Sequence, residues 1–459
     1  MKVFAAAILL LLAVTGAMAQ PVKRPAGAAA TLAGRMDRLA RFYAGNGQFM
    51  GAVLVAKGDR IVLDKGYGLA DIEWAIADTP ATKFRLGSIT KQFTAAAVLL
   101  LVERGRMALD APVKTYMPDA PAAWDAITIR HLLNHTSGIP NFTGFADFNR
   151  TKAIAQTPAQ LVARFRDKPL EFAPGTRFTY TNSGYVLLGY LIEQVSGGTY
   201  EKFLSDNIFT PLGMKDSGCD SNTALIPRRA SGYTPGAAGL RNADFVHMSI
   251  PIGGGVLYST TGDLLRWERA LFGGKLLKPQ SLAVMTTPVL GDYGMGVFVR
   301  DHKGHREISH PGAIEGFNSH MIHYPDDGLT VIVLANQNGP TAEALANKLA
   351  AMALGETGVI IPSERRRVAL DAAAAARYAG RYQVNPTTVA EVTAQKNRLF
   401  LKIGGGPASE MLFLGQGRFF RASADDEMEF AGPIGASAAE LIRHPEGGGA
   451  DDHAPRIAP

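Results

Sequence analysis

Hydrophobic and polar positions follow two different periods along the chain, and their order predicts a mixed fold. Apolar residues recur every three or four positions where we expect helices, and alternate or run together in shorter stretches where we expect strands. The early strands are predicted at 51–55 and 61–65, with a turn at Gly58-Asp59 between them. Later strands are predicted at 295–300, 305–310, 318–324 and 329–335, and helices at 88–103, 184–195, 261–272 and 341–353.

Strands therefore stand at both ends of this region, with helices between them. The economical arrangement is one antiparallel sheet built from N- and C-terminal strands, flanked by helices and packed against an all-helical subdomain. Thr157-Pro158-Ala159-Gln160 predicts a helix start with a capping box and proline in the first turn. The fold class predicted for residues 20–355 is α+β.

The pattern changes towards the C-terminus. Residues 356–369, which hold Pro362 and three consecutive arginines, are predicted to be a linker. Short alternating strands such as 399–403 predict a small β domain, barrel-like, over residues 370–445. Residues 446–459 are rich in Gly, Asp and Pro and are predicted to be a disordered tail.

The first residues have the composition of an export signal. Lys2 precedes an apolar run, and Ala17-Met18-Ala19 forms a small-residue cleavage site before Gln20. The apolar run is shorter than the roughly 20 residues that a membrane span needs. We therefore interpret residues 1–19 as a signal peptide and expect a periplasmic or secreted protein without a membrane anchor after cleavage.

Composition narrows the class of protein further. The chain has 459 residues, of which 47% are hydrophobic, and this excludes a mostly disordered chain. The formal net charge of +6 is spread over the sequence, so no nucleic-acid partner is expected. The single cysteine, Cys219, excludes a disulfide within the chain and has no motif around it.

Common cofactor and metal signatures are absent from the sequence. It has no H-E-x-x-H, no Walker loop, no C-x-x-C and no G-x-S-x-G. His131 and His135 have the spacing of one helix face, but without a third ligand nearby a structural role is favoured over zinc binding. We expect neither a metal nor a cofactor.

One serine has a lysine three residues later. If Ser88 opens a helix, Lys91 lies one turn further on the same face, within reach of the hydroxyl. A desolvated lysine can remove the serine proton, and the amides at a helix start suit an oxyanion. The alternative is that Ser88 caps the helix and Lys91 is solvated.

Two further motifs could converge on the same place. Tyr180 and Asn182 stand two residues apart before a predicted helix, where a phenol can transfer protons and an amide can hold a substrate carbonyl. His310-Pro311-Gly312 ends a predicted strand and precedes Ala313. The alternatives are a buried tyrosine beside a capping asparagine, and a simple turn.

In this order the S-x-x-K, Y-x-N and H-x-G motifs resemble the serine hydrolase family of class C β-lactamases, penicillin-binding D-alanyl-D-alanine carboxypeptidases and related esterases. The segments 132–138, 210–214 and 254–260 also match, so the resemblance covers roughly residues 35–355. Residues 378–445 are similar to a small β domain often appended to such enzymes. The fold that the resemblance implies agrees with the predicted α+β class.

The resemblance implies that Ser88 is the acylated nucleophile and that Lys91 and Tyr180 form its base system. Asn182 would hold the substrate, together with the His310–Ala313 segment that includes Gly312. Backbone N–H groups of Ser88 and Ala313 would form the oxyanion hole. The implied partner is a small-molecule or peptide acyl substrate.

One position departs from the family. His310 stands where antibiotic-degrading members usually have lysine, and histidine is mostly neutral at pH 7. We therefore expect weak or no β-lactamase activity and favour an esterase, amidase or D-amino-acid peptidase; His310 could instead take part in proton transfer. The alternative is a catalytically weak protein that binds cell-wall peptides or a partner. Specificity would depend on the segments 140–155 and 230–250, and the sequence does not give the oligomeric state.

Overall fold

The structure, a computed structural model, describes residues 31–458 except 237–238, 358, 360, 365–367, 406–407, 422–425, 434 and 445–449. The predicted signal peptide at 1–19 lies outside the described residues. None of the helices in the described part combines the length and apolar character that a membrane span requires.

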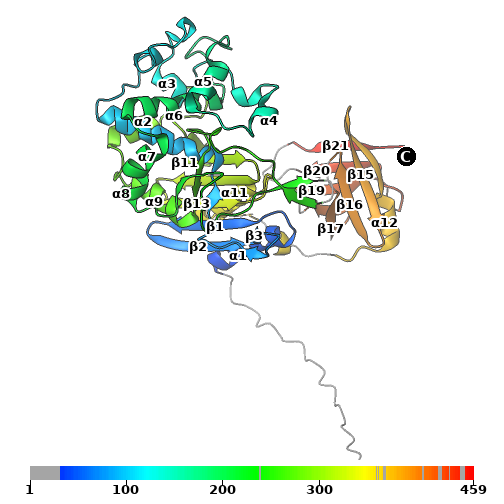
Figure 1. Cartoon of the computed structure of the whole chain (residues 1–459). Coiled ribbons are helices and arrows are strands. Elements are labelled where there is room, and N and C mark those ends of the chain that lie inside the picture. Colours follow the sequence, from blue (N-terminus) through cyan, green and yellow to red (C-terminus); the bar gives the residue numbers. More distant parts are fainter. Residues whose placement is uncertain are drawn as a thin grey trace, which may run out of the picture. The chain divides into compact units, whose positions relative to one another are not determined.

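A six-stranded antiparallel sheet forms the centre of the main domain (Figure 1). Its N-terminal strands lie next to β13, so the sheet joins the two ends of the region as predicted. In sheet order the strands are β10 (Phe298–His302), β11 (His305–Ile314), β12 (Phe317–Tyr324), β13 (Leu329–Ala335), β1 (Gly51–Lys57) and β2 (Arg60–Tyr67).

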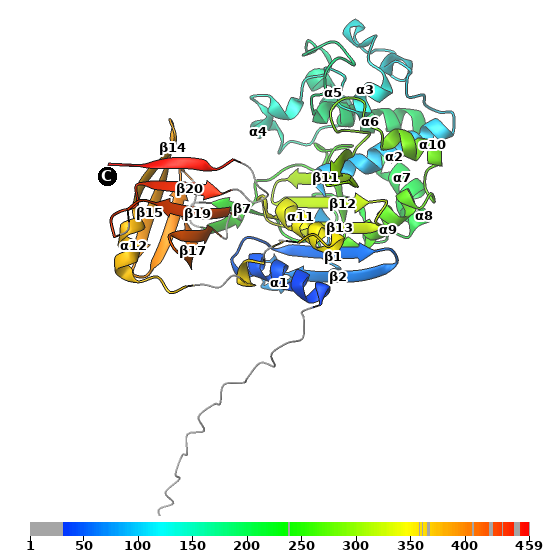
Figure 2. The same ribbon diagram turned by 180° about the vertical axis from the view of Figure 1, so that it is seen from behind.

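Alternate residues of the central strands face two separate cores. In β1, Ala52 and Leu54 belong to one core and Val53 and Val55 to the other, as the two-residue period of a strand requires. Helices α1 (Leu32–Gly45) and α11 (Thr341–Leu354) cover the Val53 face (Figure 2), and α2 (Thr90–Glu103) and α9 (Thr261–Phe272) contribute to the core on the other face.

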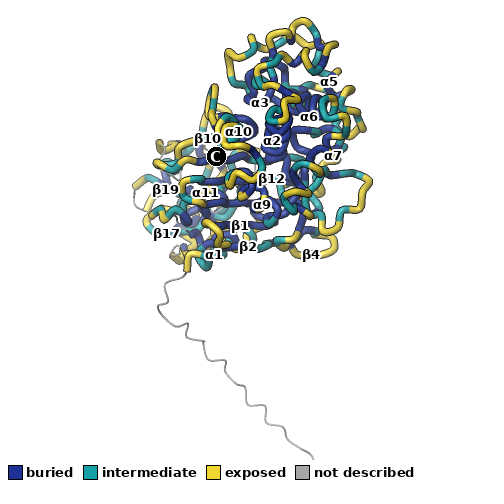
Figure 3. Tube along the Cα trace, turned by 90° about the vertical axis from the view of Figure 1, so that its left-hand side faces the viewer, coloured by how far each residue is buried: buried dark blue, intermediate teal, exposed yellow. Residues whose placement is uncertain are grey.

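Helix α2 is buried along almost its whole length, from Thr90 to Leu101 (Figure 3). From Ala95 to Leu101 it is apolar on every side, because it packs between the sheet and the helical subdomain. The other helices of the main domain are α3 (Ile129–Leu133), α4 (Phe148–Thr151), α5 (Pro158–Arg166), α6 (Asn182–Ser196), α7 (Tyr200–Leu204), α8 (Thr210–Leu212) and α10 (Pro279–Met285). The capping box predicted at Thr157 is confirmed at the start of α5.

Three small sheets complete the main domain. One of them, with the strand order β5-β9-β6, leads directly into the turn that carries Ser88. The strands are β3 (Leu69–Asp71) with β4 (Ile76–Ala77), β5 (Phe84–Arg85) with β9 (Leu257–Ser259) and β6 (Gly218–Cys219), and β7 (Tyr233–Gly236) with β8 (Gly239–Asn242).

The C-terminal strands form a closed eight-stranded antiparallel barrel with its own apolar core. The predicted α+β class with a small C-terminal β domain is therefore confirmed. Helix α12 (Ala372–Tyr378) precedes the strands β14 (Gly380–Asn385), β15 (Thr388–Gln395), β16 (Arg398–Ile403), β17 (Ser409–Gly415), β18 (Arg418–Arg421), β19 (Asp426–Ala431), β20 (Glu440–His444) and β21 (Asp452–Ile457).

The prediction that residues 446–459 are a disordered tail is wrong for 452–457. This segment is β21, which pairs with β20 on one side and β14 on the other and so closes the barrel. Without it both neighbours would expose an unpaired edge. The Gly- and Asp-rich composition belongs to the residues just before the strand.

The predicted linker at 356–369 is only partly described. In its described part Ile361 is fully buried against the core that contains α11, and Glu364 pairs with Arg38 of α1 at 2.7 Å. The domain boundaries at 355 and 370 remain predictions.

The strand predicted at 305–310 runs on to Ile314 as part of β11. Ile314 and Phe317 close a two-residue turn, so the backbone groups of every second residue of β11, counted back from Ala313, face away from β12. Pro311 is one of these residues, and its missing N–H therefore costs no hydrogen bond to β12. His310-Pro311-Gly312 is therefore part of a strand, and the simple turn of the alternative interpretation is wrong. The pairing of β10 with β11 extends only to Ser309, so the backbone groups of Ala313 on that side have no strand beside them within the described residues.

Candidate active site

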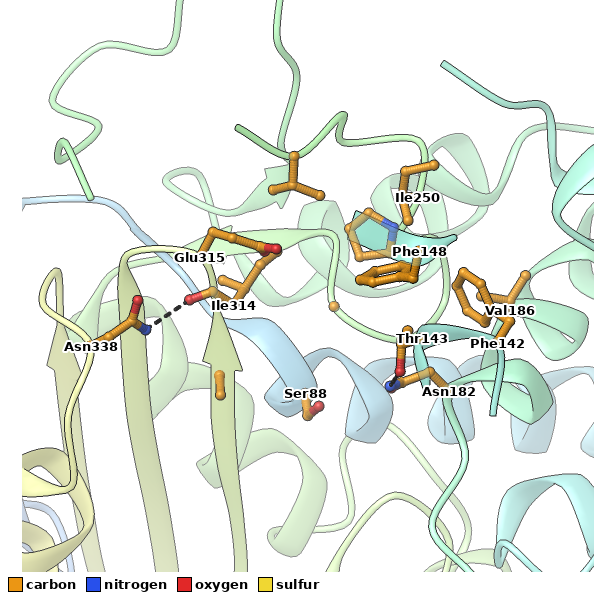
Figure 4. Close-up of a pocket in the computed structure, with 15 residues that line it drawn as sticks. Ser88, Phe142, Thr143, Phe148, Asn182, Val186, Ile250, Ile314, Glu315 and Asn338 are labelled. Carbon is orange, nitrogen blue, oxygen red and sulfur yellow. Dashed lines mark hydrogen bonds between the residues drawn. The ribbon is translucent and has the colours of Figure 1, made fainter. Parts of the chain in front are cut away.

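Ser88 lies in a single 3₁₀ turn, η1 (Gly87–Ile89), directly before α2. The helix predicted to start at Ser88 thus begins with a tighter turn. Gly87 has φ +54, a conformation that favours glycine, and Leu86 donates its N–H to the Leu257 carbonyl at 2.8 Å. Strand pairing on one side and helix packing on the other therefore hold the serine in place. Figure 4 shows Ser88 at the base of a pocket.

Lys91 is fully buried one turn along from Ser88. Its Nζ lies 3.0 Å from Ser88 Oγ, 2.9 Å from Asn182 Oδ1 and 2.9 Å from the Gly254 carbonyl oxygen. Burial lowers the pKa of Lys91 to about 7. The predicted pairing of Ser88 with Lys91 is present, and the solvated lysine of the alternative interpretation is not.

The amide of Asn182 is held in one orientation. Its Oδ1 accepts from Lys91, and its Nδ2 donates to Thr143 Oγ1 at 3.2 Å (Figure 4). Thr143 Oγ1 in turn donates to Asn141 Oδ1 at 3.0 Å, and Asn141 Oδ1 accepts the backbone N–H of Asn182. One amide hydrogen of Asn182 remains for a group in the pocket.

Tyr180 lies over the same lysine. Lys91 Nζ is 4.9 Å from the centre of the Tyr180 ring. Burial raises the pKa of Tyr180, although a hydrogen bond with Ser88 acts in the opposite direction. The phenol therefore keeps its proton at neutral pH and can supply it to another atom.

His135 fixes the segment that carries Tyr180. Its Nδ1 accepts the N–H of Thr181 at 3.2 Å, its carbonyl accepts the N–H of Thr179 at 2.9 Å, and its ring lies 4.2 Å from that of Tyr180. His131 instead accepts the Thr128 N–H at the start of α3. Within the described residues no group of His, Cys, Asp and Glu is placed to hold a metal ion.

Two glycines let β11 approach the serine turn. A Cβ on Gly312 would lie 2.0 Å from the Leu86 carbonyl oxygen, and a Cβ on Gly87 would lie 2.7 Å from the Ala313 nitrogen. Because Ala313 turns its backbone away from β12, its N–H is directed to this edge. The N–H groups of Ser88 and Ala313 thus lie on neighbouring segments, the arrangement that an oxyanion hole needs.

His310 lies in β11 and is almost fully buried. Its Nδ1 donates to the Pro311 carbonyl at 2.6 Å, so its Nε2 is the acceptor for the Tyr293 hydroxyl at 2.9 Å. Burial lowers the pKa of His310 to about 3, and the nearby Lys91 acts in the same direction. His310 is therefore neutral and, like Tyr180 and Gly312, is not among the lining residues.

The pocket above Ser88 has a volume of about 430 Å³ and mostly apolar walls. Of the described residues that line it, Glu315 alone carries a charge. The lining residues are Ser88, Phe142, Thr143, Phe148, Asn182, Val186, Val246, Ile250, Pro251, Gly254, Gly255, Ala313, Ile314, Glu315 and Asn338.

Several of these groups escaped the sequence analysis. The segments 140–155 and 230–250 were predicted to shape specificity, and Phe142, Phe148 and Ile250 lie within or beside them. Thr143 and Gly254 lie in segments that the sequence analysis named, but their bonds to Asn182 and Lys91 were not predicted. Glu315 gave no signal in the sequence, because its role depends on contacts across the fold.

Comparisons with known proteins agree with this geometry. A sequence model of the β-lactamase family matches residues 28–355, and one of a domain of unknown function matches residues 364–439. The chain is 31% identical over 422 residues to penicillin-binding protein 4* of Bacillus subtilis, which covers 86% of this chain and 92% of that protein.

Two further proteins are similar over the main domain. A D-aminopeptidase of Brucella anthropi is 30% identical over 338 residues, which is 70% of this chain but only 62% of that protein. The crystal structure of a penicillin-binding protein from Bacillus halodurans has a TM-score of 0.62 at 29% identity and covers 68% of this chain and 98% of its own.

Proposed function

Because the chain belongs to the β-lactamase family of serine hydrolases, we propose that it cleaves ester or amide bonds through an acyl-enzyme formed on Ser88. The observation that carries the proposal is the hydrogen bond of 3.0 Å between Ser88 and a fully buried lysine whose pKa is lowered to about 7. A neutral Lys91 can accept the serine proton, which an ordinary solvated lysine cannot do at pH 7.

In the first step Ser88 Oγ bonds to the substrate carbonyl carbon while its proton passes to Lys91. The negative charge on the carbonyl oxygen is stabilised by the N–H groups of Ser88 and Ala313. The bond to the leaving group then breaks, and the leaving group takes a proton from the Tyr180 phenol, which regains one from Lys91. Water repeats the same steps on the ester of Ser88 and restores the enzyme.

The composition of the pocket favours a substrate whose acyl group is uncharged and apolar. Its walls are mostly hydrophobic, and its one charged lining residue, Glu315, is an acid paired with Lys152 and so offers no positive charge to a carboxylate. His310 cannot supply a positive charge, because burial lowers its pKa to about 3. These features support esterase, amidase or D-amino-acid peptidase activity with weak or no β-lactamase activity, and the likeness to a D-aminopeptidase agrees with this.

We propose that the protein acts outside the cytoplasm. Residues 1–19 have the composition of a cleaved signal peptide, and the B. subtilis and B. halodurans relatives are penicillin-binding proteins. The substrate would then be a small ester, an amide or a cell-wall peptide.

Initial rates on p-nitrophenyl butyrate test the proposal. We expect hydrolysis by the protein lacking residues 1–19 and its loss in Ser88→Ala, with slower turnover of the β-lactam nitrocefin in the same preparation. Ser217→Ala is the matched control, because Ser217 bonds to Ser259 and Asp263, away from the pocket. Equal rates in Ser88→Ala and the parent protein, or no hydrolysis by either, would overturn acyl transfer at Ser88. A catalytically weak protein that binds cell-wall peptides or a partner would then be favoured.

A further inference from the structure

The walls of the pocket come from three segments that are far apart in the sequence. Phe142 and Phe148 belong to the helical subdomain, Val246 and Ile250 to the loop after β8, and Ile314 to the β11–β12 turn. Figure 4 shows Ile314 on one side of the pocket, with Phe142, Phe148 and Ile250 on the other. The width of the pocket therefore depends on what holds these segments together.

Lys152, just after α4, contacts the other two segments. Its Nζ lies 3.0 Å from Glu315 Oε1 in the β11–β12 turn and 3.7 Å from Asp244 Oδ2 in the loop after β8. Its carbonyl oxygen also accepts the backbone N–H of His247 at 2.8 Å. One residue thus joins all three walls, although it is not itself a lining residue.

The segment that carries Lys152 is itself well anchored. Arg164 of α5 donates to Asp147 Oδ1 at 2.8 Å and to Thr151 Oγ1 at 2.7 Å, on either side of α4. On the other side of the pocket, Asn338 Nδ2 donates to the Ile314 carbonyl at 3.0 Å, which fixes the turn that holds Glu315. The ion pair therefore joins two segments that are each held by further hydrogen bonds.

The ion pair is more protected than a surface pair. The side chain of Lys152 is 11% exposed and that of Glu315 is 22% exposed. Asp244 is 56% exposed and also pairs with Arg241 at 2.8 Å, so Glu315 is the principal partner of Lys152. Exposed ion pairs contribute little to stability. A pair shielded from water is harder to separate, because each charge would be left buried without its partner.

We propose that Lys152 is a positioning residue that sets the width of the acyl pocket through its ion pair with Glu315. The inference rests on the proposed function, since it concerns the substrates of the same site. With the pair intact, the apolar walls contact an acyl chain longer than acetyl. Without it, the β11–β12 turn moves away from the segment that carries Lys152, which stays bonded to the loop after β8 through the Lys152 carbonyl. The contacts with the acyl chain then weaken while Ser88 and Lys91 stay in place.

The test compares p-nitrophenyl acetate with p-nitrophenyl butyrate in Lys152→Met. Full burial of the two additional methylene groups gains about 15-fold, so we expect a partial loss, with the butyrate-to-acetate ratio of kcat/KM falling about three- to tenfold. The fall should come from a higher KM for butyrate, with kcat for acetate within about twofold. Lys152→Arg, which keeps the charge, should retain most of the ratio.

Two further variants make the result decisive. Glu315→Gln removes the same pair from the other side, so it should lower the ratio, and the double variant should lower it no further than Lys152→Met alone. Lys275→Met, which removes an exposed lysine in the loop after α9, is the matched control and should leave the ratio unchanged.

Three outcomes would overturn the inference. A ratio within twofold of the parent in both Lys152→Met and Glu315→Gln, or an equal loss on both esters, would show that the pair does not set the width of the pocket. A shift of the same size in Lys275→Met would also contradict it. If no variant or parent shows Ser88-dependent hydrolysis, the proposed function itself fails, and the inference falls with it.

Discussion

The side-chain nitrogen of Lys91 lies 3.0 Å from the hydroxyl oxygen of Ser88, and its other two hydrogen bonds go to oxygens that can only accept. Asn182 Oδ1 and the Gly254 carbonyl therefore use two N–H groups of the lysine. When Lys91 has lost its third proton, its lone pair is directed at the one partner that can donate, Ser88. Hydrogen-bond geometry and the lowered pKa thus assign the same role to Lys91.

The first prediction concerns pH. Only the neutral form of Lys91 accepts a proton, and burial lowers its pKa to about 7, so kcat/KM should rise with pH up to about 7 and level off above it. The profile should be measured with p-nitrophenyl butyrate from about pH 5.5 to 8.5. Lys91→Met should lose about 10²- to 10⁴-fold in kcat/KM. A flat profile for the parent enzyme would be incompatible with Lys91 as the base.

Gly312→Ala should impair catalysis without touching a side chain of the site. The added Cβ would lie 2.0 Å from the Leu86 carbonyl and must push β11 away from the turn that carries Ser88. Losing one oxyanion-hole donor in this way lowers kcat about 10²- to 10³-fold. Gly198→Ala is the control, because its Cβ would meet nothing within 4 Å. If the two variants keep equal activity, Ala313 is not part of the oxyanion hole.

The role of β21 in closing the barrel can be tested by a buried charge. Ala454 is 5% exposed and pairs with Leu441 of β20, so Ala454→Asp places an unpaired carboxylate in the barrel core. We expect a destabilisation of about 3 kcal/mol, measured by denaturant unfolding. Ala458→Asp changes an exposed alanine just beyond β21 and should have little effect. Similar unfolding curves for both variants would support the tail that the composition predicts.

Export can be tested by expressing the protein in a Gram-negative bacterium and determining its N-terminal residue. Cleavage after Ala19 would leave Gln20 as the first residue. N-terminal sequencing of the periplasmic fraction should give this end, and Ala17→Arg with Ala19→Arg should block processing. A full-length chain that stays in the cytoplasm would disprove the signal peptide.

The pairing of Ser88 with Lys91 could be predicted because the two residues are close in sequence. Lys91 lies three residues away, a spacing that fixes the contact once the segment is helical. The fold was also predictable, since β1 and β13 are apolar strands at opposite ends of the region and are adjacent in the sheet. Tyr180 and Asn182 likewise share one segment, which His135 holds through the Thr181 N–H.

The sequence could not place the groups whose partners are far away in the chain and meet them only in the folded structure. The Gly254 carbonyl reaches Lys91, 163 residues away in sequence, and Lys152 reaches Glu315 only after α4 and the β11–β12 turn meet. Pro311 lies in a strand and not in the simple turn of the alternative interpretation, because residues 308–314 pair with β12. In each case the residue type is common in loops, and its role depends on a contact with a distant segment that the local sequence does not reveal.

The most direct test of the account is to trap the acyl group. The protein should be mixed with p-nitrophenyl butyrate, quenched in acid during turnover, digested with trypsin and analysed by mass spectrometry. Cleavage after Arg85 and Lys91 isolates the peptide Leu86–Lys91, in which Ser88 can carry the ester. The account predicts a butyryl group on Ser88 of this peptide and none in Ser88→Ala. Turnover with the peptide unmodified and the butyryl group on another residue would contradict it.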